Sequence, residues 1–424
     1  MTTTTVSLSR NDYKVISLSL LGGALEVFDF IIFVFLSSTI ADVFFPAHTP
    51  EWVRLLESMT IFSIGYLARP LGGLLIAHFS DRYGRKHMFN FTVLVMAMPC
   101  LVMGVLPGYD QAGYWAPLML LLARIVQGAA LGGEVPNAWV FVVEHTPASR
   151  RGLSLGLLQA GLSFGYMLAA LTVTFINSYF TAEEVTQWAW RIPFIVGGIL
   201  GFISVWLRRW LQETPVFVAL QRDQALSERL PLADILQKHR SSVVPASLLT
   251  VVLTSTVILS VVVLPVIMQK EWHFDTASTF KISCAGILAM NIGCIIAGRI
   301  ADKAGAWPTF AAYSVLAAVA VTMMSYAHGL GMSAVIAGYV LLGLCSGTIA
   351  AVPALMVRLF PSRVKVTGIS LIYNITYSVC SSILPLTILT LYHNAHWALS
   401  GFAWLVAGTG LVTFATCRKG QIYD

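Results

Sequence analysis

Twelve long runs of predominantly apolar residues make up most of this 424-residue chain, and short polar segments separate them. A helix that crosses the hydrocarbon core of a bilayer needs about 20 such residues. Hydrocarbon offers no partner to backbone N–H and C=O groups, so a spanning segment must satisfy them internally, as a helix does. The sequence predicts spans at 15–40, 56–79, 88–107, 113–143, 153–178, 190–210, 241–269, 280–301, 308–327, 331–358, 366–391 and 396–416. We therefore expect an all-α membrane protein with twelve transmembrane helices.

The composition supports a membrane protein and indicates its orientation. Only 11% of the residues are charged, whereas about a quarter are charged in a soluble protein. Most of the 26 lysines and arginines lie in segments that face the cytoplasm if the chain starts there, and four lie outside: Arg54, Arg191, Lys270 and Lys281. The positive-inside rule predicts a multi-pass protein of the cytoplasmic (inner) membrane with both termini in the cytoplasm. The net charge of +6 then reflects topology, and we expect no nucleic-acid partner.

The sequence offers little sign of catalytic chemistry. Its six cysteines are scattered, without a CxxC pair or a histidine at metal-ligand spacing. We interpret them as small apolar residues of the spans and expect no metal and no cofactor. No motif joins a nucleophile to a base, so we expect a protein other than an enzyme. The first residues lack the basic start and cleavage site of a secretory signal, so we expect the N-terminus to be retained.

A polar stretch midway along the chain divides it into two halves. The expected organisation is an N-terminal six-helix bundle at 1–210, a cytoplasmic linker at 211–240 with short interfacial helices, and a C-terminal six-helix bundle at 241–424. The segment "AHFSDRYGRK" (77–86) between spans 2 and 3 is echoed by "GRIADKAGAW" (298–307) between spans 8 and 9. Such repeats are typical of transporters that build two bundles around a central site.

The segment "GYLARPLGGLLIAHFSDRYGRK" resembles the loop 2–3 motif of the major facilitator superfamily, in particular its metabolite:proton symporter family. That family includes proline/betaine, alpha-ketoglutarate, shikimate and citrate transporters. Other stretches that fit it are "LEVFDF", "RIVQGAALGGE", "WRIPF", "RRWLQETPVF" and "GISLIYNI". The resemblance implies two pseudo-symmetric six-helix bundles that transport a small metabolite. This chain departs from the family pattern at Ala77 and at Val27. It also departs in the second loop, which lacks arginines after Gly305, and for this reason we expect a weaker gate on the C-terminal side.

Five charged residues lie within the predicted spans of the N-terminal half: Glu26, Asp29, Arg69, Arg124 and Glu134. Charged residues at membrane depth are functional candidates. These three acids and two bases carry an excess of one negative charge, which a proton would neutralise. We assign proton coupling to Asp29, Glu26, Arg124 and Glu134, although packing between helices is an equal alternative for Glu134.

The resemblance implies an ion pair between Arg124 and a span-1 acid. Asp29 is the expected partner, with Glu26 as the alternative, and the pair is expected to open when the acid is protonated or substrate binds. A permanent structural ion pair is the other interpretation. If the first is correct, Asp29→Asn abolishes proton-coupled accumulation and leaves some exchange.

The candidate substrate-binding residues are Arg69, Arg124, Gln127, Gln159, Tyr373 and Asn374. Arg69 lies twelve residues from Asp81, about 18 Å deeper along a helix, where a guanidinium would hold a carboxylate by two parallel hydrogen bonds. The alternatives are that Arg69 snorkels or pairs with a span-1 acid. For Asn374, holding neighbouring helices together is the alternative.

The candidate gating residues are Asp81, Arg82, Gly84, Arg85, Glu144 and Asp302. We expect Asp81 at the N-terminus of a neighbouring helix, where the helix dipole favours an anion. Arg82 and Arg85 are expected to pair with acids at other helix ends, Glu144 being the nearest candidate. The alternative is that these charges serve topology alone.

Together these features predict a transporter that imports a small polar metabolite, an organic acid or a zwitterion, by proton symport with alternating access. We expect a monomer in the bilayer whose coupling ion is the proton. A proton-driven exporter or antiporter and a sodium-coupled carrier are the alternatives. Drug:proton antiporters of the superfamily carry a Gly-Pro pair in span 5, and no proline occurs from 148 to 192 here, which disfavours export.

Overall fold

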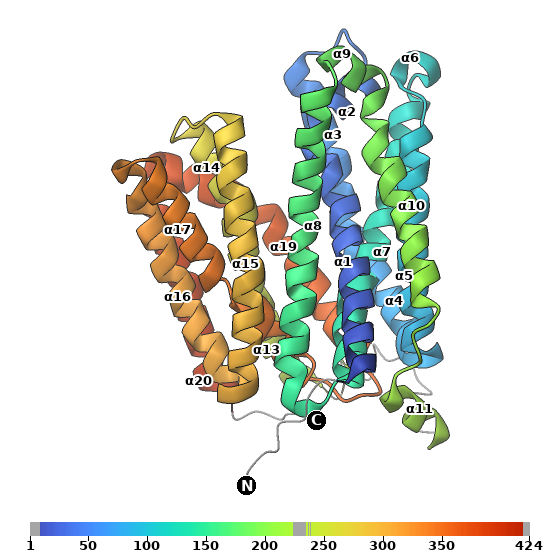
Figure 1. The fold of residues 1–424 in the computed structure, drawn as a ribbon, viewed down its shortest axis with the longest axis vertical. Helices are drawn as coiled ribbons and strands as arrows, with labels where there is room; N and C mark the ends of the chain where they lie inside the picture. The colour runs from blue at the N-terminus through green and yellow to red at the C-terminus, as the bar shows by residue number, and fades with distance from the viewer. Residues whose placement is uncertain (1–8, 224–234, 236, 238, 419–424) are drawn as a thin grey trace.

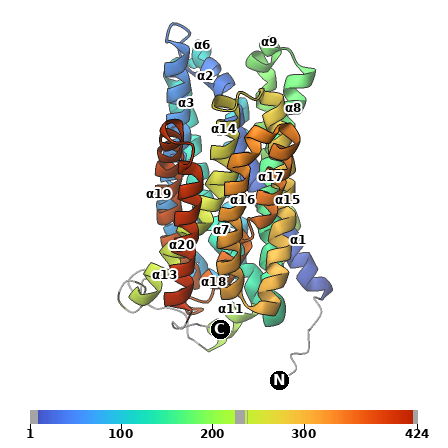
Figure 2. The same ribbon diagram turned by 90° about the vertical axis from the view of Figure 1, so that its left-hand side faces the viewer.

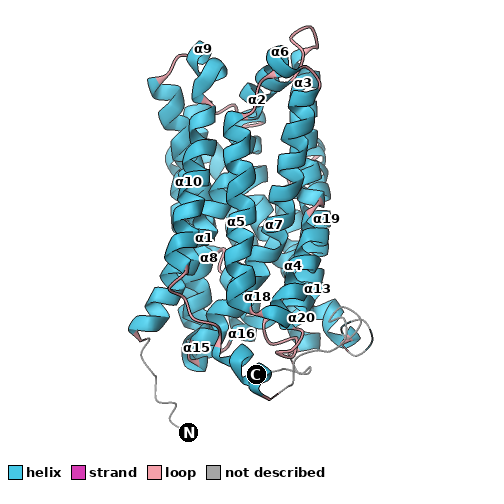
Figure 3. Ribbon diagram, turned by 90° about the vertical axis from the view of Figure 1, so that its right-hand side faces the viewer, coloured by secondary structure: helices cyan, strands magenta, loops and turns pink. Residues whose placement is uncertain are grey.

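The computed structural model describes residues 9–223, 235, 237 and 239–418, and these residues form helices and loops without strands (Figures 1 and 3). The helices before the linker are α1 (Arg10–Phe35), α2 (Ser37–Phe44), α3 (Glu51–Leu67), α4 (Arg69–Tyr83), α5 (Arg85–Val105), α6 (Tyr109–Ala112), α7 (Trp115–His145), α8 (Arg151–Tyr179), α9 (Ala182–Glu184) and α10 (Arg191–Arg208). After α11 (Pro215–Arg222) come α13 (Arg240–Val257), α14 (Leu264–Lys270), α15 (Thr276–Ala304), α16 (Ala306–Ala327), α17 (Met332–Cys345), α18 (Thr348–Met356), α19 (Lys365–Asn394) and α20 (Ala398–Cys417).

The described residues contain 12 helical segments that are long and apolar enough to cross a membrane. Each one overlaps a span predicted from the sequence, so the predicted fold class is confirmed. Some spans are not single helices. The second consists of α3 and α4, the seventh of α13, a π-helical stretch at Ile258–Val263 and α14, and the tenth of α17 and α18.

The second span is interrupted at Ala68. Pro70 lies in the first turn of α4, where a residue without a backbone N–H is tolerated because that N–H has no partner within the helix. The interruption makes Arg69 the first residue of α4. A guanidinium is thereby held in the middle of a span.

The two halves of the chain pack together along two sets of helices: α8 against α15, and α4 and α7 against α19. In Figure 1, α8 and α15 converge toward the end where α1 begins. Glycines allow this approach, because a Cβ atom added to Gly156 would lie 2.5 Å from the carbonyl oxygen of Cys294, and one added to Gly298 would lie 2.4 Å from that of Gly152. At the opposite end, the rings of Phe35 and Phe280 meet with their centroids 6.0 Å apart.

The start of α1 and the end of α20 lie at the same end of the molecule (Figure 2), as an even number of spans requires. The segment after α10 also lies at this end (Figure 1). Thr214 there caps the start of α11, since its hydroxyl accepts a hydrogen bond from the backbone N–H of Phe217. Residues 224–234, 236 and 238 of the predicted linker lie outside the described residues. The bundle boundaries at 210 and 241 therefore stay a prediction.

Candidate functional site

A cavity of about 70 Å³ lies between the two halves. Helices α1, α3, α4, α7 and α8 line it from the N-terminal half, and α13, α15, α18 and α19 from the C-terminal half. Most of its lining is apolar, and its polar residues are Tyr66, Arg69, Gln159, Ser163, Tyr166, Tyr373 and Tyr377. A central cavity with contributions from both halves is where an alternating-access transporter binds its substrate.

Arg69 is the one charged residue among those that line this cavity. Its side chain is 3% exposed, and its guanidinium carbon lies 4.7 Å from the ring centroid of Tyr377, 5.3 Å from that of Tyr66 and 5.8 Å from that of Tyr373. Its Nε atom has no hydrogen-bond partner in the described structure. A buried guanidinium held by ring faces, with no carboxylate in the lining, is suited to receive an anionic group from a ligand.

Two other candidate substrate-binding residues, Gln159 and Tyr373, also line the cavity. Gln159 accepts a hydrogen bond from the Trp139 indole N–H at 2.9 Å and donates one to the Ile349 carbonyl oxygen at 3.2 Å. Because Ile349 belongs to the C-terminal half, Gln159 joins the two halves beside the cavity. The role of either residue in binding stays a prediction.

Asn374 lies elsewhere, in the interface between α7 and α19. Its amide nitrogen donates to the carbonyl oxygens of Gly132, at 2.7 Å, and of Ser370, at 2.9 Å. The alternative weighed from the sequence, that this asparagine holds neighbouring helices together, describes these contacts. The expectation that Asn374 faces the substrate is not met, because its donor group is already used by two backbone carbonyls.

Arg124 and Gln127 lie behind the cavity wall, inside the N-terminal half. The Arg124 guanidinium carbon lies 4.2 Å from the ring centroid of Phe30 and 4.5 Å from that of Phe33. Arg124 donates to the carbonyl oxygen of Phe30 at 3.3 Å and to the side-chain oxygen of Gln127. Backbone and amide acceptors and aromatic faces thus surround this guanidinium, whose Nε and Nη2 atoms have no hydrogen-bond partner in the described structure.

The expected ion pair between Arg124 and Asp29 is therefore not formed in the described structure. Gln127 instead donates to the backbone carbonyl oxygen of Asp29, at 3.3 Å. The Asp29 carboxylate lies against α10, since a Cβ atom added to Gly197 would be 2.0 Å from its Oδ1 atom, and it interacts with the thiol of Cys100. The acid and the base point to different neighbours.

Glu134 forms an ion pair that the sequence did not suggest. Its carboxylate lies 2.9 Å from a guanidinium nitrogen of Arg208 and accepts a hydrogen bond from the Thr92 hydroxyl. Arg208, the last residue of α10, is fully buried, although its position at a span end indicated a cytoplasmic charge. With Arg208 added, the charged residues named within the spans become three acids and three bases, and their formal charges sum to zero.

Glu26 is the remaining acid of the first span. It is 4% exposed, and neither carboxylate oxygen has a hydrogen-bond partner in the described part of the chain. It also forms no ion pair with Arg124, which was the alternative pairing considered from the sequence. Glu26 is therefore a buried carboxyl group without a contacting cation.

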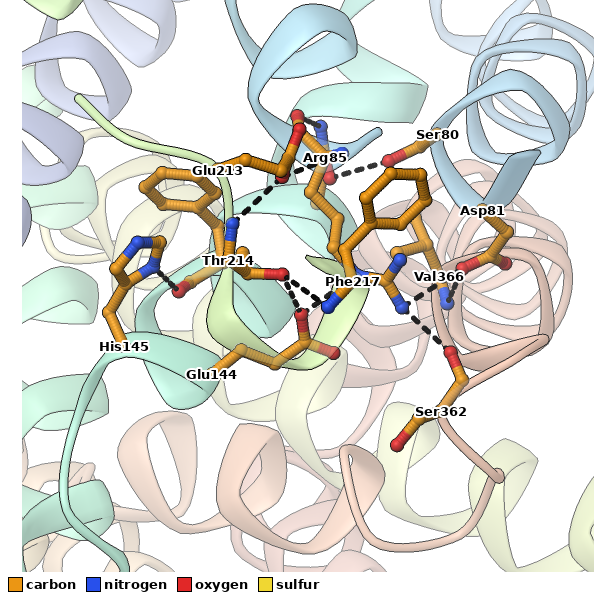
Figure 4. A network of polar contacts seen from close by, with 12 residues as sticks. Ser80, Asp81, Arg85, Glu144, His145, Glu213, Thr214, Phe217, Ser362 and Val366 are labelled. Carbon is orange, nitrogen blue, oxygen red and sulfur yellow. Dashed lines mark hydrogen bonds and ion pairs between the residues drawn. The ribbon is translucent and has the colours of Figure 1, made fainter. Parts of the chain in front are cut away.

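The loop motif places Asp81 where the sequence predicted it, at the N-terminus of a helix from the other half. Its carboxylate accepts a hydrogen bond from the backbone N–H group of Val366, at 3.3 Å (Figure 4). It accepts another from the backbone N–H group of Thr367, at 2.8 Å, also in the first turn of α19. These N–H groups have no partner within the helix, and the helix dipole favours a negative charge there. Asp81 therefore ties α4 to α19.

The repeated loop makes the reciprocal contact. Asp302, at the end of α15, accepts hydrogen bonds from the backbone N–H groups of Gly152, at 2.6 Å, and Leu153, at 2.9 Å. These residues occupy the second and third positions of α8, as Val366 and Thr367 do in α19. Each half thus supplies a carboxylate that caps a helix of the other.

Arg85 reinforces the contact on one side only. It forms ion pairs with Glu144, at 2.8 Å, and Asp81, at 3.6 Å, and donates to the carbonyl oxygen of Ser362 at 2.7 Å (Figure 4). The predicted pairing with Glu144 is confirmed. The repeat offset places Ala306 at the position that corresponds to Arg85, and alanine cannot form these contacts.

Arg82 does not take part in this network. It is exposed, and its guanidinium carbon lies 5.7 Å from the ring centroid of Tyr83. The expected ion pair of Arg82 with an acid at a helix end is absent from the described structure. Because Arg82 is exposed at the end of a span, water solvates its guanidinium and weakens ion pairs there.

Sequence reasoning missed Glu213 and Thr214, although both lie in the quoted stretch "RRWLQETPVF". Glu213 accepts hydrogen bonds from the backbone N–H groups of Arg85 and Lys86, each at 3.1 Å, and so caps α5. The Thr214 hydroxyl donates to Glu144 at 2.6 Å (Figure 4). Gly84 adopts φ +118° beside this cap, and a Cβ atom there would lie 2.5 Å from a Glu213 oxygen. The segment after α10 therefore belongs to the same network.

Twelve apolar helices, two halves that cap each other's helices and a cavity between them define a membrane transporter. The family model of the Major Facilitator Superfamily matches residues 20–385, and the chain belongs to this family. It is 29% identical over 394 residues to the "Putative proline/betaine transporter" of Staphylococcus aureus (strain COL), covering 92% of this chain and 81% of that one. To the "Proline/betaine transporter" of Salmonella typhimurium it is 29% identical over 373 residues, covering 86% and 74%.

Among solved structures, the fold is similar to that of the proton:xylose symporter XylE bound to 6-bromo-6-deoxy-D-glucose. The TM-score is 0.79 at 14% sequence identity, and the match covers 96% of this chain and 95% of that one. The fold expected from the sequence, that of the major facilitator superfamily, is thereby confirmed, and the protein is a transporter and not an enzyme.

Proposed function

We propose that this protein imports a small zwitterionic metabolite of the amino-acid or betaine type by proton symport. The observation that carries the proposal is the guanidinium of Arg69, which lies in the central cavity without a carboxylate in the lining. A substrate carboxylate would supply the missing anion, in the two-point geometry that arginine favours. The names of the relatives, proline/betaine transporters, support a zwitterion over an organic acid.

The tyrosines of the cavity offer a place for the cationic end of such a substrate. Ring faces attract quaternary ammonium groups, and no acid in the lining would compete for them. Tyr66 and Tyr377 contact the Arg69 guanidinium. A carboxylate that draws the guanidinium toward itself would free part of these faces for the substrate's own cation.

Import would proceed by alternating access in a monomer, with the proton as coupling ion and no other cofactor. We place the protein in the cytoplasmic membrane with both termini in the cytoplasm, which puts the Asp81 and Asp302 contacts on the cytoplasmic side. These contacts would close that side, and their rupture would release substrate inward. A weaker gate at the Asp302 side stays part of this proposal.

Uptake into proteoliposomes with a defined pH difference tests the proposal. We expect labelled proline or glycine betaine to accumulate when the outside is acidic, and a protonophore to abolish accumulation. Citrate, with three carboxylates and no cation, is expected to compete poorly. Accumulation driven by sodium without a pH difference would identify a sodium-coupled carrier, and coupled efflux alone would identify an exporter; either result would overturn the proposal.

A further inference from the structure

We infer that Glu26 is the proton-binding residue of this transporter and that a substrate carboxylate at Arg69 controls its protonation. The inference rests on the proposed proton symport and names the residue that performs it. It assigns the proton to Glu26 in place of Asp29, the acid that the family resemblance favours.

Glu26 belongs to a buried cluster that four helices of the N-terminal half build. The Arg208 guanidinium packs against α1 at Gly22, where a Cβ atom would lie 1.8 Å from its Nη2 atom. Glu26 follows Gly22 by four residues, so both lie on one face of α1, about 6 Å apart along the axis. Glu134 from α7 and Thr92 from α5 complete the cluster.

Arg208 makes its contacts within this cluster. It pairs with Glu134 at 2.9 Å, donates to the carbonyl oxygen of Phe89 at 2.9 Å, and packs over the Phe89 ring with its carbon 3.7 Å from the centroid. The cluster therefore holds two carboxyl groups and one guanidinium, and the guanidinium forms its ion pair with Glu134. Glu26 is left with both oxygens buried and unpartnered in the described structure. An unpaired charge is costly at this depth, and a proton on Glu26 removes that cost.

The charges that act on Glu26 link this cluster to the cavity. They are Glu134 and Arg208 within the cluster, Asp29 on the same helix, and Arg69 of the cavity. Glu26 also acts on the phenol of Tyr373, which lines the cavity from α19. Its neighbour Val27 is part of the cavity wall. Phe30, one helical turn after Glu26 on the same face of α1, is also part of this wall, so Glu26 lies beside the cavity that contains Arg69.

Coupling follows from this arrangement. While the cavity is empty, the positive charge of Arg69 favours the ionised form of Glu26. A substrate carboxylate on Arg69 cancels that charge, so Glu26 takes up a proton from the outer side, and the proton leaves to the cytoplasm once the substrate has gone. By linkage the effect is reciprocal, since a protonated Glu26 leaves Arg69 free to hold the substrate. One proton would accompany each carboxylate.

Asp29 is less suited to this task. Its carboxylate contacts the Cys100 thiol and lies against Gly197, inside the N-terminal half. The cavity wall on α1 consists of Val27, Phe30 and Ile31, so Asp29 is not part of it. A change of charge in the cavity therefore affects Glu26 through Arg69, whereas no corresponding cation of the cavity lining acts on Asp29.

The test compares Glu26→Gln, Asp29→Asn and the wild type in proteoliposomes, with Asp110→Asn in the exposed outer loop as a matched control. The three readouts are protonophore-sensitive accumulation of labelled proline or glycine betaine, exchange without a gradient, and substrate affinity from pH 5 to pH 9. We expect Glu26→Gln to retain exchange, to lose accumulation and to bind substrate with an affinity independent of pH. Asp29→Asn is expected to keep both coupling and the pH dependence.

A second variant keeps the test decisive if Glu26→Gln does not fold. Glu134→Gln releases Arg208 to pair with Glu26, which favours the ionised form, so the pH midpoint of substrate affinity should fall by about one unit. An unchanged midpoint, accumulation by Glu26→Gln, or loss of coupling in Asp29→Asn would overturn the inference while leaving proton symport intact. If the wild type itself moves no protons with substrate, the proposed function fails as well.

Discussion

Arg69, Arg124 and Arg208 are buried in the N-terminal half and differ in what their guanidinium groups contact. Arg208 is paired with Glu134, and Arg124 contacts Gln127, a backbone carbonyl and phenylalanine rings. Arg69 alone of the three lines the cavity. Only a guanidinium whose hydrogen-bonding capacity is open to the cavity can exchange partners during a transport cycle. We therefore expect substitutions of Arg69 to affect substrate affinity and those of Arg208 to affect coupling or stability.

Arg69→Lys tests this division. An ammonium group keeps the charge but cannot form the two parallel hydrogen bonds of a guanidinium, so we expect the KM for the substrate to rise about tenfold, or about 1.4 kcal/mol of binding free energy. Thermal stability in detergent should change little, since the charge and the alkyl stem remain. Arg191→Lys, the same change at a half-exposed arginine, is the matched control. An unchanged KM in Arg69→Lys would remove Arg69 from the binding site.

Gly84 carries a separate prediction at the residue scale. Its φ of +118° belongs to a region that other residues avoid at a cost of roughly 1–3 kcal/mol, and its missing Cβ leaves room for Glu213. Gly84→Ala should therefore lower the melting temperature in detergent. Gly408→Ala in α20, where an added Cβ meets nothing within 4 Å, should leave it equal or higher. Equal effects of the two substitutions would show that the cap at Gly84 is unimportant.

At the scale of whole elements, the two carboxylate caps hold α19 to α4 and α8 to α15. An anion at a helix N-terminus contributes about 0.3–2 kcal/mol, the upper end where it is buried, and Asp81 is the more buried of the two acids. Arg85 adds ion pairs on the Asp81 side, whereas Ala306 stands at the corresponding position of the repeat. The two sides of the gate should therefore differ in strength.

Asp81→Asn is expected to open the cytoplasmic side more than Asp302→Asn does. The opening can be measured by placing a cysteine at Ser370, which lies buried at the α7–α19 interface, in a background without the native cysteines. A membrane-impermeant maleimide should label this cysteine in inverted vesicles faster when Asp81 is changed than when Asp302 is. Equal rates would mean that Arg85 adds nothing to the gate.

At the scale of the whole molecule, the spans and the repeat were predictable because lipid imposes a length and an apolar composition on every spanning helix. The contact of Asp81 with a helix N-terminus and the ion pair of Arg85 with Glu144 were predictable from local sequence motifs. The partners of Glu26, Asp29 and Arg124 were not predictable. Each further residue along a helix turns the direction of the side chain by about 100°, and an apolar run does not specify which face of the helix meets which neighbour. Arg208 was misjudged because a charge at a span end usually reaches water.

The charge carried in one transport cycle tests the whole scheme. A zwitterion that enters with one proton moves one positive charge inward, so an inside-negative potential should drive uptake even without a pH difference. Each 100 mV supplies about 2.3 kcal/mol per charge, enough for about fifty-fold accumulation. Proteoliposomes loaded with potassium and treated with valinomycin provide this potential, and liposomes with equal potassium on both sides are the control. Uptake that requires a pH difference and ignores the potential would instead identify a monocarboxylate as the substrate, since its charge and that of the proton cancel.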